Sequence, residues 1–108
     1  MDNICVLGIN YSIHFKNRND DKVLDDCDGY CDKTTKEIVV LDVDRKNSNL
    51  HNPEWYKKKV LRHEIVHAFL IESGLQENVT WDEELLVDWI AAQGQKIYKA
   101  WQEAECLG

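Results

Sequence analysis

The sequence lacks any long hydrophobic run and has no surplus of basic residues. Its apolar stretches are a few residues long, whereas a helix that crosses a membrane needs about 20. The 108 residues carry a net charge of −7. Nucleic-acid-binding domains usually present a basic stripe, and anionic membranes attract basic segments. The composition therefore argues against a membrane-spanning protein, and against nucleic acid or a lipid surface as the partner.

The first five residues also lack the basic region and the apolar run of a secretory signal peptide, which predicts a cytoplasmic location. In that compartment the four cysteines are expected to be thiols and not a disulfide framework. Cys27 and Cys31 are four residues apart and could share a metal ion. No second ligand pair follows at the spacing of a zinc ribbon, which disfavours that interpretation.

The residues that are abundant indicate a folded domain. Apolar residues make up 44% of the chain, charged residues 31%, and there are four tryptophans and four tyrosines. Disordered chains have few aromatic residues and cannot bury enough apolar surface to order themselves. The length suits one hydrophobic core and no more. Residues 1–108 are therefore expected to form a single domain.

The first half of the chain has the pattern of β-structure. Residues 4–15 alternate apolar and polar side chains in places, as a half-buried strand does. Residues 17–28 are polar and acidic, which predicts a loop. Residues 29–31 and 37–41 flank the turn-forming residues 32–36, so they are expected to pair as a hairpin. We expect a small antiparallel sheet.

The second half has the pattern of two helices. Residues 52–54 read Asn-Pro-Glu, a helix start with a capping side chain, a proline in the first turn and an acid behind it. That helix is expected to run to Ser73, because Gly74 is a common stop. Residues 80–83 form a capping box for a second helix that ends near Ala104. The fold class is therefore α+β, with a small sheet, a long helix and a C-terminal helix.

The long helix carries the sequence His63-Glu64-Ile65-Val66-His67. Residues four apart lie above one another on a helix, so both imidazoles can bind one metal ion. Neutral imidazole suits zinc, and a catalytic zinc site has three protein ligands and an open position for water. Glu64 lies about 100° around the helix from His63, at the edge of the same site. There it can act as a general base.

The alternative is a pair of solvent-facing histidines without a metal. The rest of the segment is apolar, with Ile65 and Val66 inside the motif and Ala68 and Phe69 after it. A helix that is buried on both sides of the motif holds its histidines rigidly, as a catalytic site requires. This context favours the HExxH metal site over the chance pair.

A third ligand is not found in the long helix. Glu72 lies nine residues after His63, about 180° around the helix, and points away. Glu84 and Asp88 are spaced i and i+4 near the start of the second helix, which a short connection would fold back against the first. One of these carboxylates can bind zinc while the other accepts the spare N–H of a histidine ligand. Both could instead be surface acids.

An HExxH helix followed by a helix with Glu-x-x-x-Asp resembles the gluzincin metallopeptidases, the class typified by thermolysin. Residues 63–69 and 87–91 are also similar to small metallopeptidase-like proteins of phages and prophages, and more distantly to the ImmA/IrrE family. The resemblance covers about residues 37–95 and implies a minimal zincin fold with a zinc cofactor. It also implies that Glu84 is the third zinc ligand and that Asp88 braces the first histidine.

The expected function is zinc-dependent hydrolysis of peptide bonds, with Glu64 first as general base and then as general acid. A peptide or protein substrate could add as a strand to an exposed sheet edge, for which residues 38–41 are a candidate. The side chain that stabilises the oxyanion stays open, and the candidates are Tyr11, Tyr30, Tyr56, Tyr98 and His14.

Two other functions fit the same motif. The chain could be a catalytically weak or inactive zinc-containing phage or prophage protein that binds a partner protein. It could also hydrolyse an amide other than a peptide bond. Glu64 favours an enzyme, because a purely structural zinc site does not need that acid.

Overall fold

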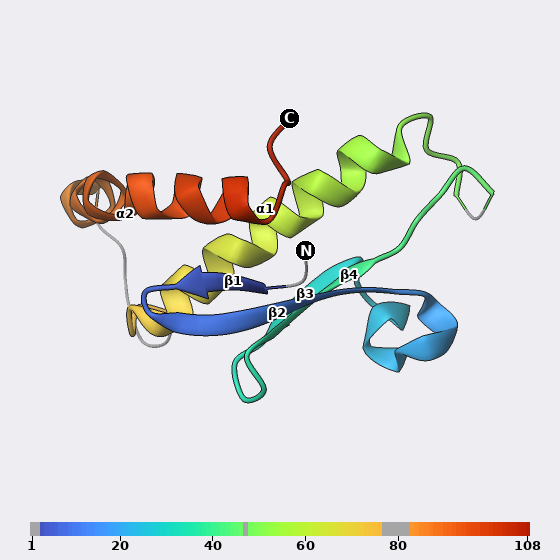
Figure 1. The fold of residues 1–108 in the computed structure, drawn as a ribbon, viewed down its shortest axis with the longest axis horizontal. Helices are drawn as coiled ribbons and strands as arrows, with labels where there is room; N and C mark the ends of the chain where they lie inside the picture. The colour runs from blue at the N-terminus through green and yellow to red at the C-terminus, as the bar shows by residue number, and fades with distance from the viewer. Residues whose placement is uncertain (1–2, 47, 77–82) are drawn as a thin grey trace.

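The N-terminal segment folds as a hairpin of β1 (Asn3–Val6) and β2 (Ile9–Lys16) in the computed structural model (Figure 1), which describes residues 3–46, 48–76 and 83–108. The turn residues Leu7 and Gly8 have φ angles of 50° and 89°. Two successive positive φ angles are typical of the tight turns whose twist matches a hairpin. The prediction of one strand over residues 4–15 was therefore wrong, because it overlooked this turn.

A second hairpin is formed by β3 (Gly29–Asp32) and β4 (Glu37–Leu41), as the sequence predicted. The strand order is β1-β2-β4-β3, and β4 pairs with β2 in parallel. The sheet is therefore mixed, and the predicted antiparallel sheet was wrong. The chain between β2 and β4 is long enough for the crossover that parallel strands need. Local alternation does not reveal this long-range pairing.

The connection between β2 and β3 is more ordered than a plain loop. It contains two short 3₁₀ helices, η1 (Arg18–Asp20) and η2 (Lys22–Asp25), and the Asp21 side chain accepts a hydrogen bond from the backbone of Val23. Leu24 of η2 is fully buried. This one apolar side chain anchors an otherwise polar segment to the sheet.

The long helix α1 (Pro53–Glu72) has the predicted bounds. The Asn52 side chain accepts a hydrogen bond from the Trp55 N–H, as a capping residue does. Gly74 has a φ of 73°, the left-handed conformation that ends many helices. The second helix, α2 (Glu83–Glu103), ends close to the predicted Ala104. Its predicted capping box at residues 80–83 lies outside the part that the structure describes.

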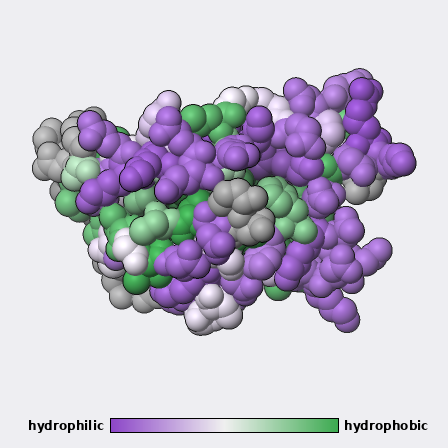
Figure 2. All heavy atoms as spheres, viewed as in Figure 1, coloured by the Kyte–Doolittle hydropathy of each residue, from purple (hydrophilic) through white to green (hydrophobic). Residues whose placement is uncertain are grey.

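Both helices cover one face of the sheet, and α2 runs back over α1 and β1 (Figure 1). The main core joins residues of β1, β2 and β4 to α1 and α2. A second cluster on the other sheet face contains Leu24, Val39, Leu41 and Val43, with Tyr56 packed against it. Hydrophilic residues cover most of the upper and right-hand surface in Figure 2, and hydrophobic residues gather on the left, below α2. The domain is therefore α+β, with one helical layer.

None of the described helices combines the length and the apolar character that crossing a membrane requires. The four cysteines carry free thiols. Cys31 packs against the main core and Cys27 against the second cluster, so the two cysteines belong to different clusters.

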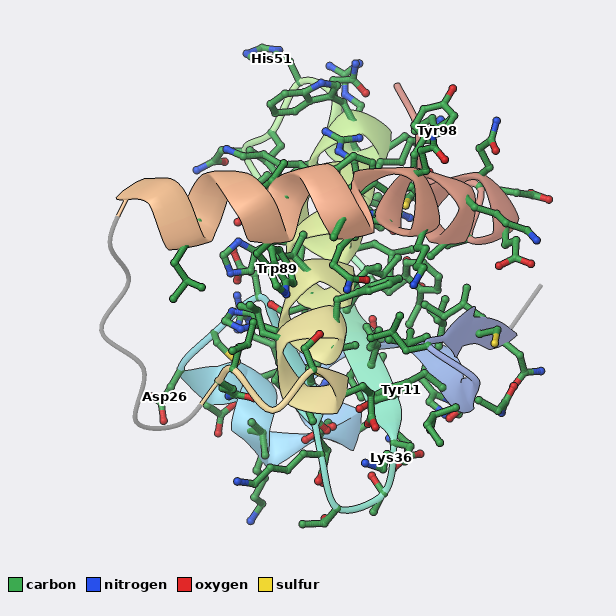
Figure 3. All side chains as sticks on the ribbon, turned by 90° about the vertical axis from the view of Figure 1, so that its left-hand side faces the viewer. Tyr11, Asp26, Lys36, His51, Trp89 and Tyr98 are labelled. Carbon is green, nitrogen blue, oxygen red and sulfur yellow. The ribbon has the colours of Figure 1, made fainter. Side chains whose placement is uncertain are left out.

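The C-terminal end of α1 is tied to the sheet by Glu72. Its carboxylate accepts a hydrogen bond of 2.6 Å from the Tyr11 hydroxyl and forms an ion pair of 2.7 Å with Lys36. Figure 3 shows Tyr11 and Lys36 together at this end of the molecule. The Lys36 ammonium and the Tyr11 hydroxyl hold the pKa of Glu72 below its ordinary value of 4.5.

We predict that Glu72→Gln lowers the free energy of unfolding by about 1–2 kcal/mol at pH 7. Because the folded-state pKa is depressed, this stabilisation is complete above the unfolded-state pKa and is lost as the pH falls through the folded-state value. Urea unfolding from pH 7 to pH 3 should show the gap between the proteins closing below about pH 4.5. The exposed Glu103→Gln is the control, and a gap that stays constant with pH would contradict the assignment.

Candidate metal centre and reaction cleft

The two histidines of the motif converge on one side of α1. The ring centroids of His63 and His67 are 4.9 Å apart, and their Nε2 atoms are separated by 3.2 Å. His63 is exposed and His67 is half-buried. Burial and the neighbouring His63 lower the pKa of His67, which favours the neutral imidazole that a metal ion needs. The pair is thus both accessible and suited to bind a metal.

The distance between the nitrogens provides a test of zinc binding. Two ligand nitrogens in a tetrahedral zinc site, each about 2.0–2.1 Å from the metal, are roughly 3.3–3.4 Å apart. The observed Nε2 separation of 3.2 Å is close to this value. The same separation is that of the hydrogen bond between the two rings. Among the described residues, no third His, Cys, Asp or Glu joins the pair. The spacing of the two nitrogens is therefore compatible with zinc.

Glu64 differs from the histidines because its side chain is buried, with 6% of its surface exposed. It lines a cleft of about 280 Å³ together with His63, Val60 and Gly29. Burial raises the pKa of Glu64, and the positive charge of His63 partly opposes this rise. Among the described residues, none donates a hydrogen bond to its carboxylate. The carboxylate is therefore available to a water molecule or a substrate in the cleft.

Gly29 allows the start of β3 to approach α1 at this cleft. A Cβ atom added there would lie 2.6 Å from Val60 Cγ1, 3.2 Å from the Val39 carbonyl oxygen and 3.4 Å from Glu64 Cγ. Distances below 3.0 Å are not tolerated without movement, so only glycine fits this position. From the sequence, Gly29 was expected only to begin a strand, because its close approach to α1 depends on tertiary packing.

The sheet edge next to the cleft is β3. β4, which contains the candidate residues 38–41, lies between β2 and β3 and is paired on both sides. The suggestion that residues 38–41 form the exposed edge was therefore wrong, because β4 inserts beside β2. Within the described residues, β3 pairs with β4 alone. Its outer edge starts at Gly29, directly beside Glu64.

The predicted third ligand and its neighbour fall in α2, but the side chains of Glu84 and Asp88 lie outside the described part of the structure. The same helix does contact α1 next to the motif: Leu86, Trp89 and Ile90 line one apolar groove with Val66. Trp89 projects from α2 towards α1 in Figure 3. Since Val66 precedes His67, the predicted folding-back of the second helix towards the motif is confirmed at the level of the helices.

The oxyanion candidates are mostly engaged elsewhere. The Tyr11 hydroxyl donates to Glu72, and the Tyr30 hydroxyl donates to Asp21. His14 contacts Ser12 and Glu37 on β2 and β4, and Tyr98 is a half-exposed residue of α2.

Of the five candidates, Tyr56 lines the cleft with His63 and Glu64. Its hydroxyl donates to Asp28, and it precedes His63 by seven residues, or roughly 10.5 Å along the helix axis. This distance is too long for a hydroxyl group that stabilises charge beside the metal ligands. Residues 56, 60, 63 and 67 are three or four apart and therefore share one face of the helix. This spacing is the feature of the sequence that could have placed Tyr56 in the cleft.

Cys31 follows Gly29 by two residues on β3, and its thiol packs against the main core. Burial and the nearby negative charges of Glu64, Asp32 and Glu72 raise the pKa of Cys31 to about 12. It is therefore a neutral thiol at physiological pH, whereas a metal ligand would be a thiolate.

Comparisons of the chain with protein-family models, with curated proteins and with solved structures found no match. The case for a function consequently depends on the geometry of the cleft and on the motif.

We predict that Gly29→Ala destabilises the protein by about 1–3 kcal/mol, the usual cost of overpacking, because β3 must move away from α1. Gly94→Ala is the matched control: a Cβ atom there meets nothing within 4 Å, and alanine in a helix is favoured by about 1 kcal/mol. Urea unfolding should therefore show opposite signs for the two variants. A neutral Gly29→Ala would mean that the approach of β3 to α1 is looser than the structure indicates.

Proposed function

We propose that this chain is a zinc-dependent peptidase of the gluzincin kind. The observation that carries the proposal is the convergence of the His63 and His67 Nε2 atoms to 3.2 Å beside the buried carboxylate of Glu64, to which no side chain in the described part of the structure donates a hydrogen bond. A metal-binding protein without catalysis needs the histidines but has no use for an acid that is expensive to bury. The geometry therefore supports a hydrolase better than a structural zinc site.

Zinc bound by His63 and His67, with Glu84 as the proposed third ligand, supplies polarisation of a carbonyl group and a lower pKa for an attacking water. Glu64 accepts a proton from that water and later delivers it to the leaving amine. Burial raises the pKa of Glu64, which makes its carboxylate a stronger proton acceptor. Asp88 is proposed to accept the second ring N–H of a histidine ligand and thereby to orient it.

A peptide or protein is the proposed substrate, bound as an added strand on the outer edge of β3. Main-chain hydrogen bonds to β3 would align the peptide, and Gly29 brings the start of that edge next to Glu64. A cytoplasmic location belongs to the same proposal.

The alternative, a catalytically weak phage or prophage protein that binds a partner, keeps the same zinc ligands. In that alternative Glu64 has no catalytic role. Hydrolysis of an amide other than a peptide bond would instead give the edge of β3 no role in binding. The tests below separate these possibilities.

We predict one zinc per chain in the purified protein, and a large loss of zinc in His63→Ala and in His67→Ala. Each variant removes one of the ligands whose nitrogens converge, while His51→Ala removes an exposed histidine outside α1. Metal analysis of the three variants, with circular dichroism to verify the fold, makes the comparison. Full zinc retention in either motif variant would exclude the proposed centre.

The roles of the two α2 carboxylates separate in the same assay. Glu84→Ala should remove a direct bond to zinc, whereas Asp88→Asn should weaken zinc affinity or activity by about 10- to 100-fold. If Asp88→Ala abolishes zinc binding and Glu84→Ala does not, the two roles are reversed.

The final test of catalysis is Glu64→Gln, which keeps nearly the same side-chain volume. We predict that it retains zinc and lowers the cleavage rate by about 10²- to 10⁴-fold, because an amide cannot transfer the proton. The matched control is Glu54→Gln, an exposed residue of the same helix. A substrate is first selected from a peptide library with the wild-type protein and verified by chelator inhibition. Equal rates for wild type and Glu64→Gln would rule out Glu64 as the general base.

A further inference from the structure

A second cavity lies beside the reaction cleft. Its volume is about 490 Å³, compared with about 280 Å³ for the cleft that contains Glu64. Asp28 and Tyr56 line both, and the Tyr56 hydroxyl donates a hydrogen bond to Asp28. The two spaces are therefore neighbours, on either side of one hydrogen-bonded pair.

The walls of this second cavity are apolar at the sheet. They include Leu41 and Val43, which are buried in the second cluster, and Leu50, which is 37% exposed. Leu41 and Val43 already belong to a packed cluster, while Leu50 presents free apolar surface to the cavity. A volume of this size accommodates a large side chain, since ligand pockets begin at about 300 Å³.

The charges at the rim cancel. Arg18 contributes its guanidinium group and Asp28 its carboxylate, and the two form an ion pair of 2.9 Å. Arg18 also donates hydrogen bonds to the carbonyl oxygens of Leu24 and Cys27. Because both charges are neutralised within the wall, an ionised side chain in the cavity would find no free counter-charge among the described lining residues. The rest of the lining includes two asparagines and a serine, so the cavity favours an uncharged occupant whose apolar part faces the leucine and valine side chains.

The position of the cavity relates it to a substrate. Tyr56 precedes His63 by roughly 10.5 Å of helix axis, and an extended peptide advances about 3.3 Å per residue. A peptide whose scissile bond lies at Glu64 therefore reaches the cavity about three to four residues away. This is a range at which a separate side-chain pocket can contribute to selectivity.

We propose that this cavity, between Leu41, Val43, Leu50 and the Tyr56–Asp28 pair, is a distal subsite for a large apolar side chain of the peptide substrate. The proposal rests on the proposed peptidase function, and it identifies the substrate class as peptides with an apolar residue three to four positions from the scissile bond, towards the N-terminal end of α1.

The test uses a set of fluorescent peptides built on the sequence that the wild-type protein cleaves, with leucine, glycine, aspartate or lysine at each of positions two to five on both sides of the bond. We expect leucine to exceed aspartate and lysine by about 10- to 100-fold in kcat/KM at one position, three or four residues away. The affinity of zinc-loaded Glu64→Gln for the same peptides, measured by fluorescence anisotropy, should show the same order.

Leu50→Asp places a carboxylate in the wall of the second cavity and leaves the residues that line the cleft with Glu64 unchanged. It should abolish the preference for leucine at that one position and raise the relative rate of the lysine peptide by about 10-fold. Val23→Asp is the control, since Val23 is an apolar residue of η2 that is 53% exposed and lies outside the cavity lining. Melting curves and zinc content verify that both variants fold.

The possible results distinguish a failure of the proposed subsite from a failure of the proposed peptidase function. Cleavage that is indifferent to residues two to five, or unchanged by Leu50→Asp, overturns the subsite and leaves the peptidase intact. If the wild-type protein cleaves no peptide, leucine, glycine, aspartate and lysine are placed in turn along a fixed alanine peptide, and binding is measured by anisotropy alone. Position-specific binding of leucine that Leu50→Asp removes then supports the subsite while the peptidase fails, and no binding overturns both.

Discussion

The packing of α1 on the sheet is the constraint from which the rest of this structure follows. Leu61, Ile65, Ala68 and Phe69 of α1 are buried in the main core, and this leaves His63 and His67 on the outward side. Glu64 lies between the two sides, where Gly29 lets β3 come within van der Waals contact. A helix held in this way by its apolar residues cannot rotate without exposing the core. Hydrophobic packing therefore fixes the helix on which the two histidines and the acid lie, and a hydrogen bond of 3.2 Å joins the two histidine rings.

Several acidic side chains of the chain share one arrangement, in which the carboxylate contacts both a tyrosine and a cation. Three tyrosines each donate a hydrogen bond to a carboxylate that also faces a cation. Glu72 is shared by Tyr11 and Lys36, and Asp28 by Tyr56 and Arg18.

The third pair joins Tyr30 to Asp21, with Lys16 at 3.8 Å. Such pairs let a tyrosine ring pack against the sheet while its hydroxyl stays satisfied. The hydroxyl protons of these three tyrosines are already used in these pairs, so they are not free donors for the candidate metal centre. The same arrangement at Tyr56 separates the cleft from the second cavity and leaves the rim of that cavity without net charge.

Features that depend on neighbours in the chain could be predicted from the sequence. The bounds of α1 follow from Asn52, Pro53 and Gly74, and the β3–β4 hairpin follows from two apolar segments around a polar turn, because caps and turns act over a few residues. The convergence of His63 and His67 follows from the i, i+4 spacing of a helix. The motif was thus enough to locate the candidate metal centre before any tertiary structure was known.

Features that depend on distant segments were decided by the tertiary structure. Parallel pairing of β2 with β4, the interior place of β4 and the role of β3 as the edge all depend on pairing between residues 25 positions apart, such as Ser12 and Glu37. Local alternation of apolar and polar residues carries no information about such pairing. The burial of Glu64 and the need for glycine at position 29 are consequences of how closely β3 approaches α1. The sequence alone determined which residues could carry the chemistry, because side-chain type and helical spacing are local. Which strand faces those residues, and how much space surrounds them, was decided only when hydrophobic packing brought the helix and the sheet together.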